Sequence, residues 1–131
     1  EQVLEMNDKE MENTHDYIQW IFPLTEPSAA VPRSPVLTDH DIYIIKEDID
    51  IQKNLNKSLE RMEKFYENND NWLENYNHNH LRITRIIKSL NLLLGKDTSD
   101  RFYNGIMNRV SLYPNSISDE SITYWGKALN N

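Results

Sequence analysis

The apolar residues of this chain recur three and four positions apart, and this spacing constrains the fold more than any other feature. It is clearest over 51–66, where one face would carry Ile51, Leu55, Leu59, Met62, Phe65 and Tyr66. Because a helix brings residues three and four apart onto one face, the spacing predicts an amphipathic helix. Strand-like alternation nowhere continues beyond four residues. We therefore expect an all-α fold.

The front of the chain predicts two further helices. One would begin at Asn7 or Asp8, which can cap it, and stop at Pro23, because proline interrupts a helix. Its inward residues would be Met11, His15, Ile18 and Phe22. A short second helix would begin with a capping box formed by Thr38 and Asp41. Its inward residues would be Ile42 and Ile45.

Asp48 would cap the helix over 51–66. The sequence after that helix predicts three more helices. The first covers about 79–94 and ends at Gly95, a residue typical of helix C-termini. Thr98 or Ser99 would cap the next, and Ser118 the last. The inward residues of these three helices would be Ile83, Ile86, Ile87, Leu90, Leu94, Phe102, Ile106, Val110, Tyr113, Ile122, Trp125 and Leu129. In the Asn-rich stretch between helices, Trp72, Leu73 and Tyr76 would anchor the chain to the core.

Length and composition fit one compact domain over residues 1–131, built from about six helices. Four of the five prolines fall in 23–37, which predicts a long proline-rich loop within that domain. The chain has no cysteine, which excludes disulfides and thiol chemistry. It shows no signal peptide and no apolar run near the roughly 20 residues of a membrane helix. We expect an intracellular, cytoplasmic protein without a membrane span.

The net charge of −7 is unevenly distributed along the chain. Residues 1–50 hold twelve acids and three bases, whereas residues 51–131 hold nine acids and eleven bases. A chain with this overall charge would repel nucleic acid, which we exclude as a partner. The simplest interpretation is that the acidic front packs against the basic back.

The histidines and carboxylates of the chain suggest two alternative functions, metal binding and catalysis. His15, His78 and His80 could bind a metal if they converged, but the chain has no His-Glu-x-x-His motif and no thiolate ligand. His15 with Asp16 and His78 could serve an enzyme, yet no nucleophile motif or phosphate-binding loop is present. We favour a non-enzymatic domain with no catalytic residue, no metal and no cofactor.

Arg82 and Arg85 lie one turn apart near the start of the predicted helix over 79–94. A helix N-terminus carries partial positive charge, so two arginines there predict a site for phosphate or carboxylate. The competing interpretation is internal pairing with Asp16 or Asp41, since buried arginines are usually paired. Both interpretations stay open at this point.

Two blocks of the sequence resemble a known family. The segment over 15–24, HDYIQWIFPL, is similar to the first block of the opioid growth factor receptor conserved region. The segment over 77–90, NHNHLRITRIIKSL, resembles its second block, and 121–128 resembles the closing block of its short stand-alone members. The resemblance extends over about residues 8–129, so we expect a nearly complete short member.

The resemblance implies an all-helical domain, and its vertebrate namesake is described as a receptor for methionine enkephalin. We expect a helical binding domain that recognises a peptide or a small anionic ligand. The alternatives are the enzyme or metal protein above, and a protein–protein adaptor that uses an exposed helix face. The candidate ligand-binding residues are His15, Tyr17, Gln19, Trp20, Trp72, His78, Arg82 and Arg85.

Overall fold

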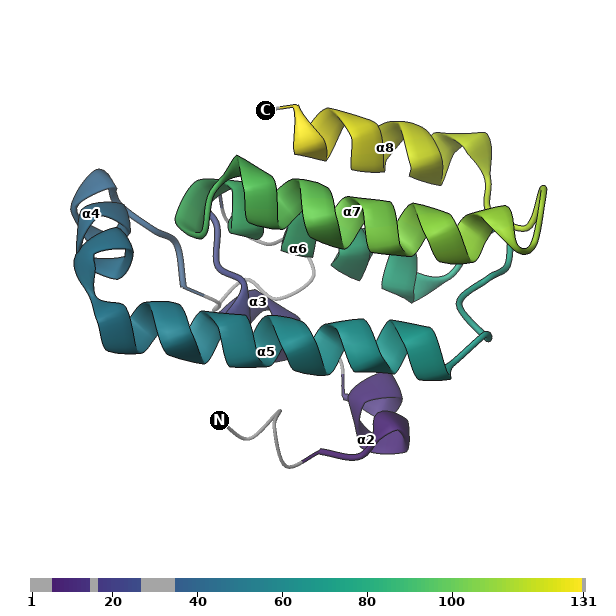
Figure 1. The fold of residues 1–131 in the computed structure, drawn as a ribbon, viewed down its shortest axis with the longest axis horizontal. Coiled ribbons are helices and arrows are strands. Elements are labelled where there is room, and N and C mark those ends of the chain that lie inside the picture. Colours follow the sequence, from purple (N-terminus) through teal and green to yellow (C-terminus); the bar gives the residue numbers. More distant parts are fainter. Residues whose placement is uncertain (1–5, 15–16, 27–34, 131) are drawn as a thin grey trace.

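The computed structural model describes residues 6–14, 17–26 and 35–130, and the elements in this part of the chain are helices (Figure 1). They are α2 (Asp8–Asn13), α3 (Tyr17–Ile21), α4 (Asp39–Glu47), α5 (Ile49–Asn68), α6 (His78–Leu93), α7 (Lys96–Ser111) and α8 (Asp119–Leu129). Outside the helices, Leu24 and Val36 form an isolated parallel bridge. The predicted all-α fold is confirmed. In the described part of the chain, no helix is long and apolar enough to cross a membrane.

Helix α6 occupies the centre of the fold. It packs on α7 and α8, while α3 and α4 also contact it and α5 lies along α7 (Figure 1). The core contains most of the predicted inward residues of α5, α6, α7 and α8, together with Met11, Ile18 and Phe22 from the front. Ile51 and Leu55 at the start of α5 are only half-buried, and the prediction for Tyr113 is wrong, because this residue is exposed beyond the end of α7. The fully buried large side chains are Trp72, Trp125, Tyr66, Phe22, Phe65 and Phe102. The predicted helix faces are therefore confirmed.

Most helix starts are where the sequence predicts them. Asn7 and Thr38 form capping boxes with the residues three positions later, Asp48 caps α5, and Ser118 caps α8. The prediction for α7 is wrong, because this helix begins at Lys96 with Gly95 as its cap. Gly95 has φ = 99°, a conformation that favours glycine. Leu94 and Gly95 alone connect α6 to α7. The Ser99 hydroxyl instead donates to the Ile87 carbonyl of α6.

The front of the chain differs from the single helix that the spacing predicts. Thr14 has an extended backbone and ends α2, and a separate helix, α3, starts at Tyr17. His15 and Asp16 lie outside the described residues. The inward face is nevertheless retained, since Met11, Ile18 and Phe22 are all buried in the core.

Ion pairs join the acidic front to the later helices. Asp8 pairs with Arg61 at 2.7 Å and Glu26 with Lys88 at 3.1 Å. The Glu12 carboxylate also lies 3.3 Å from Nε2 of His78. The ends of the proline-rich segment are also fixed, because the Leu37 N–H donates to the Leu24 carbonyl and Ser89 Oγ to the Pro23 carbonyl. The packing of front on back is confirmed by these contacts.

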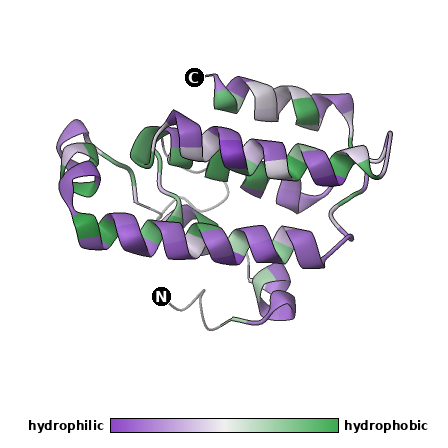
Figure 2. Cartoon of the chain, viewed as in Figure 1, coloured by the Kyte–Doolittle hydropathy of each residue, from purple (hydrophilic) through white to green (hydrophobic). Residues whose placement is uncertain are grey.

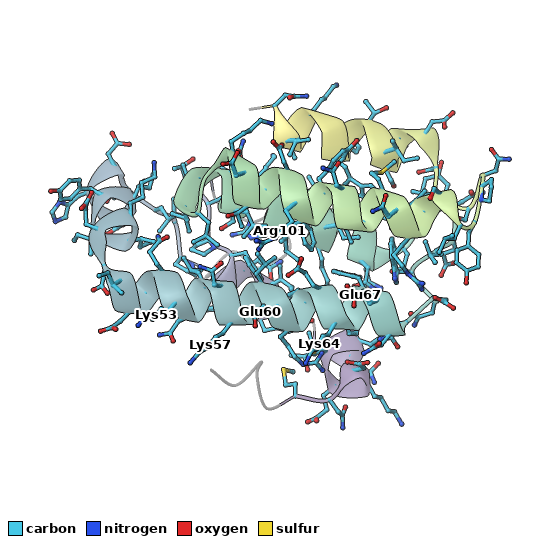
Figure 3. The ribbon with its side chains drawn as sticks, viewed as in Figure 1. Lys53, Lys57, Glu60, Lys64, Glu67 and Arg101 are labelled. Atoms are coloured by element: carbon cyan, nitrogen blue, oxygen red, sulfur yellow. The ribbon has the colours of Figure 1, made fainter. Side chains whose placement is uncertain are left out.

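One face of α5 is entirely polar. It carries Lys53, Lys57, Glu60, Lys64 and Glu67, which follow one another at helical spacing and are all exposed (Figure 3). None of the five has an ion pair within the described part of the chain. We call this surface the α5 stripe, and its composition is typical of a face in contact with water.

Candidate functional site

Arg82 lies buried between the front of the chain and α6. Its Nη1 donates to the Met11 carbonyl at 3.0 Å, and its Nη2 donates to the Thr14 carbonyl at 2.5 Å. The guanidinium carbon also lies 5.2 Å from the centre of the Tyr17 ring. Arg82 therefore fastens the end of α2 to α6 and is not open to a ligand at these atoms.

The groups around Arg82 complete a closed hydrogen-bond network. The Tyr17 hydroxyl donates to the Met11 carbonyl at 3.0 Å, and burial raises the pKa of Tyr17 to about 12. The amide of the buried Asn79 donates to Glu12 at 3.0 Å and accepts from the Tyr66 hydroxyl at 3.3 Å. Burial also raises the pKa of Tyr66 well above its usual value.

The two predicted arginine partners do not account for this network. Asp41 caps α4 by accepting from the Thr38 N–H at 2.9 Å, so internal pairing of Asp41 with either arginine is wrong. Asp16 lies outside the described residues. Arg82 is satisfied mainly by backbone carbonyls, a type of partner that spacing in a sequence does not reveal.

Arg85 is more open than Arg82. Its Nε donates to the Phe22 carbonyl at 3.0 Å, whereas its Nη2 has no partner among the described residues. Desolvation lowers the pKa of this half-buried guanidinium, and the charge of Glu26 opposes the shift. Gln19 shows a similar pattern, because its Oε1 is buried and lacks a described donor. These two residues retain hydrogen-bonding capacity.

The two predicted tryptophan contacts differ in accessibility. Trp20 is exposed on α3, although it lines none of the surface hollows described below. Trp72 is wholly buried, and its indole N–H is shared between the carbonyls of Asn69 at 2.7 Å and Tyr66 at 3.2 Å. A ligand contact through Trp72 is therefore wrong, because this ring is part of the core. Tyr76, which we expected to anchor the core, is exposed instead.

His80 is a structural link between α6 and α8. Its Nε2 lies 2.8 Å from the Trp72 carbonyl, and its Nδ1 lies 3.0 Å from Ser121 Oγ. The carbonyl can only accept, so Nε2 carries the proton and Nδ1 accepts from the serine hydroxyl. The Trp125 ring packs edge-on against His80, and its N–H donates to the His80 carbonyl at 2.9 Å. Ser121 and Trp125 of the closing block are thus explained by packing.

The predicted histidine cluster cannot be assembled from the described residues. His15 lies outside them, His78 faces Glu12, and both ring nitrogens of His80 contact protein groups. Within the described ranges, no group of three or more His, Cys, Asp or Glu side chains could hold a metal ion.

A groove runs between α6 and α8 and consists of three hollows. The first, about 440 Å³, is lined by Tyr76, Asn77, His78, His80, Leu81, Glu120, Ser121 and Tyr124. The second, about 630 Å³, is lined by Thr84, Lys88, Thr123, Tyr124, Gly126, Lys127, Ala128 and Asn130. The third, about 280 Å³, is lined by Leu24, Thr25, Glu26, Lys46, Lys88, Asn91, Leu92 and Ala128. Tyr124 belongs to the first two hollows, and Lys88 and Ala128 to the last two, so the three hollows are neighbours along α6.

The two ends of this groove differ in chemistry. Its first end presents three large side chains to solvent, with exposed fractions of 71% for Tyr76, 72% for Leu81 and 47% for Tyr124. Its other end presents Lys46, Lys88 and Lys127, of which Lys88 is paired with Glu26. The arrangement can accept an apolar side chain at one end and a negative charge at the other.

Of the predicted site residues that the structure describes, only His78 lines this groove. Sequence reasoning missed Leu81, Tyr124 and Lys127. Leu81 and Tyr124 carry a signal, because each lies inside a block with family resemblance and stands off the inward face of its helix. Lys127 carries none, since a lysine near the end of a helix is common.

A family profile and individual relatives identify the same protein family. The profile of the "Opioid growth factor receptor (OGFr) conserved region" matches residues 2–99. The human opioid growth factor receptor is 37% identical over 98 residues, which cover 61% of this chain and 14% of that receptor. The rat receptor is 33% identical over 98 residues, covering 61% of this chain and 17% of its own length. No solved structure matches the chain.

Proposed function

This chain belongs to the opioid growth factor receptor conserved-region family, and from that premise we propose that it is a peptide-binding domain. The ligand would lie in the groove between α6 and α8. The relatives are named receptors for an opioid growth factor, and the matched segment makes up 14% of the human receptor's length. Because the match covers so little of the receptor, receptor activity of this chain is a proposal.

The observation that carries the proposal is the exposure of Tyr76, Leu81 and Tyr124, which together line the first hollow of the groove. Large apolar side chains that line a concave surface are typical of binding sites. The network around Arg82, in contrast, is closed by the protein's own groups and offers a ligand little. The groove is thus the better candidate site, although Arg85, unlike Arg82, retains a nitrogen without a partner among the described residues.

The shape of the groove limits the length of the ligand. It follows α6 from His78 to Leu92, a rise of roughly 21 Å at about 1.5 Å per residue. An extended peptide of about six residues covers this distance. An aromatic or aliphatic side chain would contact Leu81 and Tyr124, and the terminal carboxylate would lie near Lys127. The proposal thus specifies a short peptide with a free C-terminus.

Calorimetric titration with methionine enkephalin tests the proposal, because the family resemblance implies this peptide. We expect Leu81→Gln to weaken binding about tenfold, since a large apolar contact of the site is lost. Lys127→Gln should weaken binding about fivefold and reduce its salt dependence. The peptide with a C-terminal amide should bind the parent protein more weakly than the peptide with a free carboxylate. The two peptides should bind the Lys127→Gln variant equally well.

Matched controls are available on the same fold. Leu112 is as exposed as Leu81 but lies at the end of α7, and Lys57 lies on the α5 stripe. Leu112→Gln and Lys57→Gln should bind like the parent protein. The proposal fails if the parent shows no binding, or if these controls weaken binding as much as the groove variants do.

A further inference from the structure

Helix α4 presents apolar side chains to solvent. It contains four consecutive apolar residues, 42–45, yet none of its residues is buried. Ile42 and Ile45 are half-buried against the body of the protein, whereas Tyr43 and Ile44 point outward with exposed fractions of 65% and 43%. Figure 2 shows these apolar positions within α4 and at the start of α5. Helix α4 thus has an apolar face that no described part of the chain covers.

The first residue of α5 extends this surface. Ile49 is 70% exposed, and the Asp48 N–H beside it donates to the Ile44 carbonyl at 3.1 Å. That bond fixes the start of α5 at the end of α4. We define the α4 face as Tyr43, Ile44 and Ile49 with the exposed residues His40 and Glu47, which follow α4 at the same helical spacing.

The surroundings of the α4 face are strongly acidic. Between residues 39 and 50 the chain holds five acids and one base, Lys46. Asp41 and Asp48 are used as helix caps, whereas Asp39, Glu47 and Asp50 are exposed and have no ion pair among the described residues. An apolar centre with an acidic rim favours a partner that is both apolar and basic.

We propose that the α4 face docks a basic amphipathic helix of another protein. Such a helix places apolar residues on Tyr43, Ile44 and Ile49, and its lysines or arginines beside Asp39, Glu47 and Asp50. Helix α4 has nine residues, so a partner of about three turns covers it. This site is separate from the groove residues with large exposed side chains, Tyr76, Leu81 and Tyr124.

A second copy of this chain does not fit the α4 face. Symmetric pairing of two α4 faces would bring their acids together, and each chain carries a net charge of −7. The α5 stripe carries exposed lysines, but together with glutamates and without an apolar residue, so it lacks the apolar centre that the α4 face would need (Figure 3). Charge and apolarity therefore both point to a different protein.

Binding of a designed peptide tests the proposal. The probe is a labelled 14-residue peptide of leucine and lysine with helical spacing, measured by fluorescence anisotropy at about 0.15 M salt, where long-range attraction is screened. We expect saturable binding that Ile44→Ser and Glu47→Lys each weaken about tenfold. The same peptide with scrambled order, or with glutamate for lysine, should not bind.

The controls match each change in chemistry. Leu112→Ser removes an exposed leucine directly after α7, and Glu60→Lys reverses a charge on the α5 stripe. Both should bind within about twofold of the parent, because they lie off the α4 face. Circular dichroism confirms folding of each variant, and Glu47→Lys provides the result if Ile44→Ser unfolds.

Three outcomes would overturn the proposal. The first is equal weakening by the control variants, and the second is equal binding of the scrambled peptide. The third is a concentration-dependent dimer in analytical ultracentrifugation that Ile44→Ser abolishes, since a second copy would then occupy the α4 face.

Discussion

Replacing Arg82 by alanine separates a structural from a ligand-binding role for this side chain. Arg82 is buried and donates to the carbonyls of Met11 and Thr14, which lie 71 and 68 residues away in sequence. In Arg82→Ala both acceptors lose a charged donor. The Met11 carbonyl keeps the Tyr17 hydroxyl, whereas water reaches the Thr14 carbonyl only if the front of the chain moves. We therefore expect a loss of stability localised at α2.

The size of the loss follows from these two contacts. A buried acceptor left without a donor costs about 1–3 kcal/mol. The variant also avoids the cost of burying a guanidinium, which offsets part of this loss. We expect the free energy of unfolding to fall by about 2–4 kcal/mol, less than the roughly 5–15 kcal/mol that a domain of this size possesses. The variant should therefore remain folded at room temperature.

Urea denaturation and limited proteolysis measure the effect together. With a slope near 2 kcal/mol per molar, the midpoint should fall by about 1–2 M urea. Trypsin should cut at Lys9 in α2 sooner than in the parent, because α2 has six residues and depends on Arg82 for its attachment. Arg101→Ala, a change of an exposed arginine on α7, should alter the midpoint by less than about 0.3 M.

Two results would refute this reasoning. A stability change below about 0.5 kcal/mol would mean that the two carbonyls do not depend on Arg82. Unchanged stability with lost enkephalin binding would assign Arg82 to a ligand instead.

Three further predictions concern Gly105, Gly95 and His80. An added Cβ at Gly105 in α7 meets no atom within 4 Å, so Gly105→Ala should raise the free energy of unfolding by about 0.5–1 kcal/mol in a urea titration. Gly95 has φ = 99°, so Gly95→Ala should lower the free energy of unfolding by about 1 kcal/mol. A fall in Gly105→Ala, or a rise in Gly95→Ala, would contradict the respective prediction. Desolvation lowers the pKa of His80 below its ordinary 6.5, although the bond to the Trp72 carbonyl opposes the shift. The unfolded chain then binds more protons, so stability should fall as the pH drops below about 6.5. Melting temperatures from pH 8 to 5 should fall more in the parent than in His80→Gln, and parallel curves would refute this.

The helices and their faces were predictable because they depend on local spacing. Leu59, Met62 and Phe65 define a face by their positions in the sequence alone, and all three are buried. The caps at Asn7, Thr38, Asp48 and Ser118 were equally local. The break at Thr14 was not, because it depends on Arg82. In an uninterrupted helix, the carbonyls of Met11 and Thr14 would accept from residues four positions later, and Arg82 binds both of them instead.

The candidate site was less predictable than the fold for the same reason. Arg82 and Trp72 look like ligand contacts in a sequence, but their partners are backbone carbonyls that no side-chain pattern reveals. Leu81 and Tyr124 became candidates only when α8 was seen beside α6, since the two residues are 43 positions apart in the sequence. A site built between distant helices requires the tertiary structure to identify it.

The position of α6 between α7 and α8 has a practical consequence for protein production. The family profile ends at residue 99, within the first turn of α7, whereas Phe102, Ile106 and Trp125 complete the core around α6. A fragment cut at that boundary would leave Ile86 and Leu90 facing water, and we expect it to aggregate. The shortest stretch that folds independently is therefore longer than the stretch that sequence comparison identifies. Expression of this domain should retain the chain through Leu129.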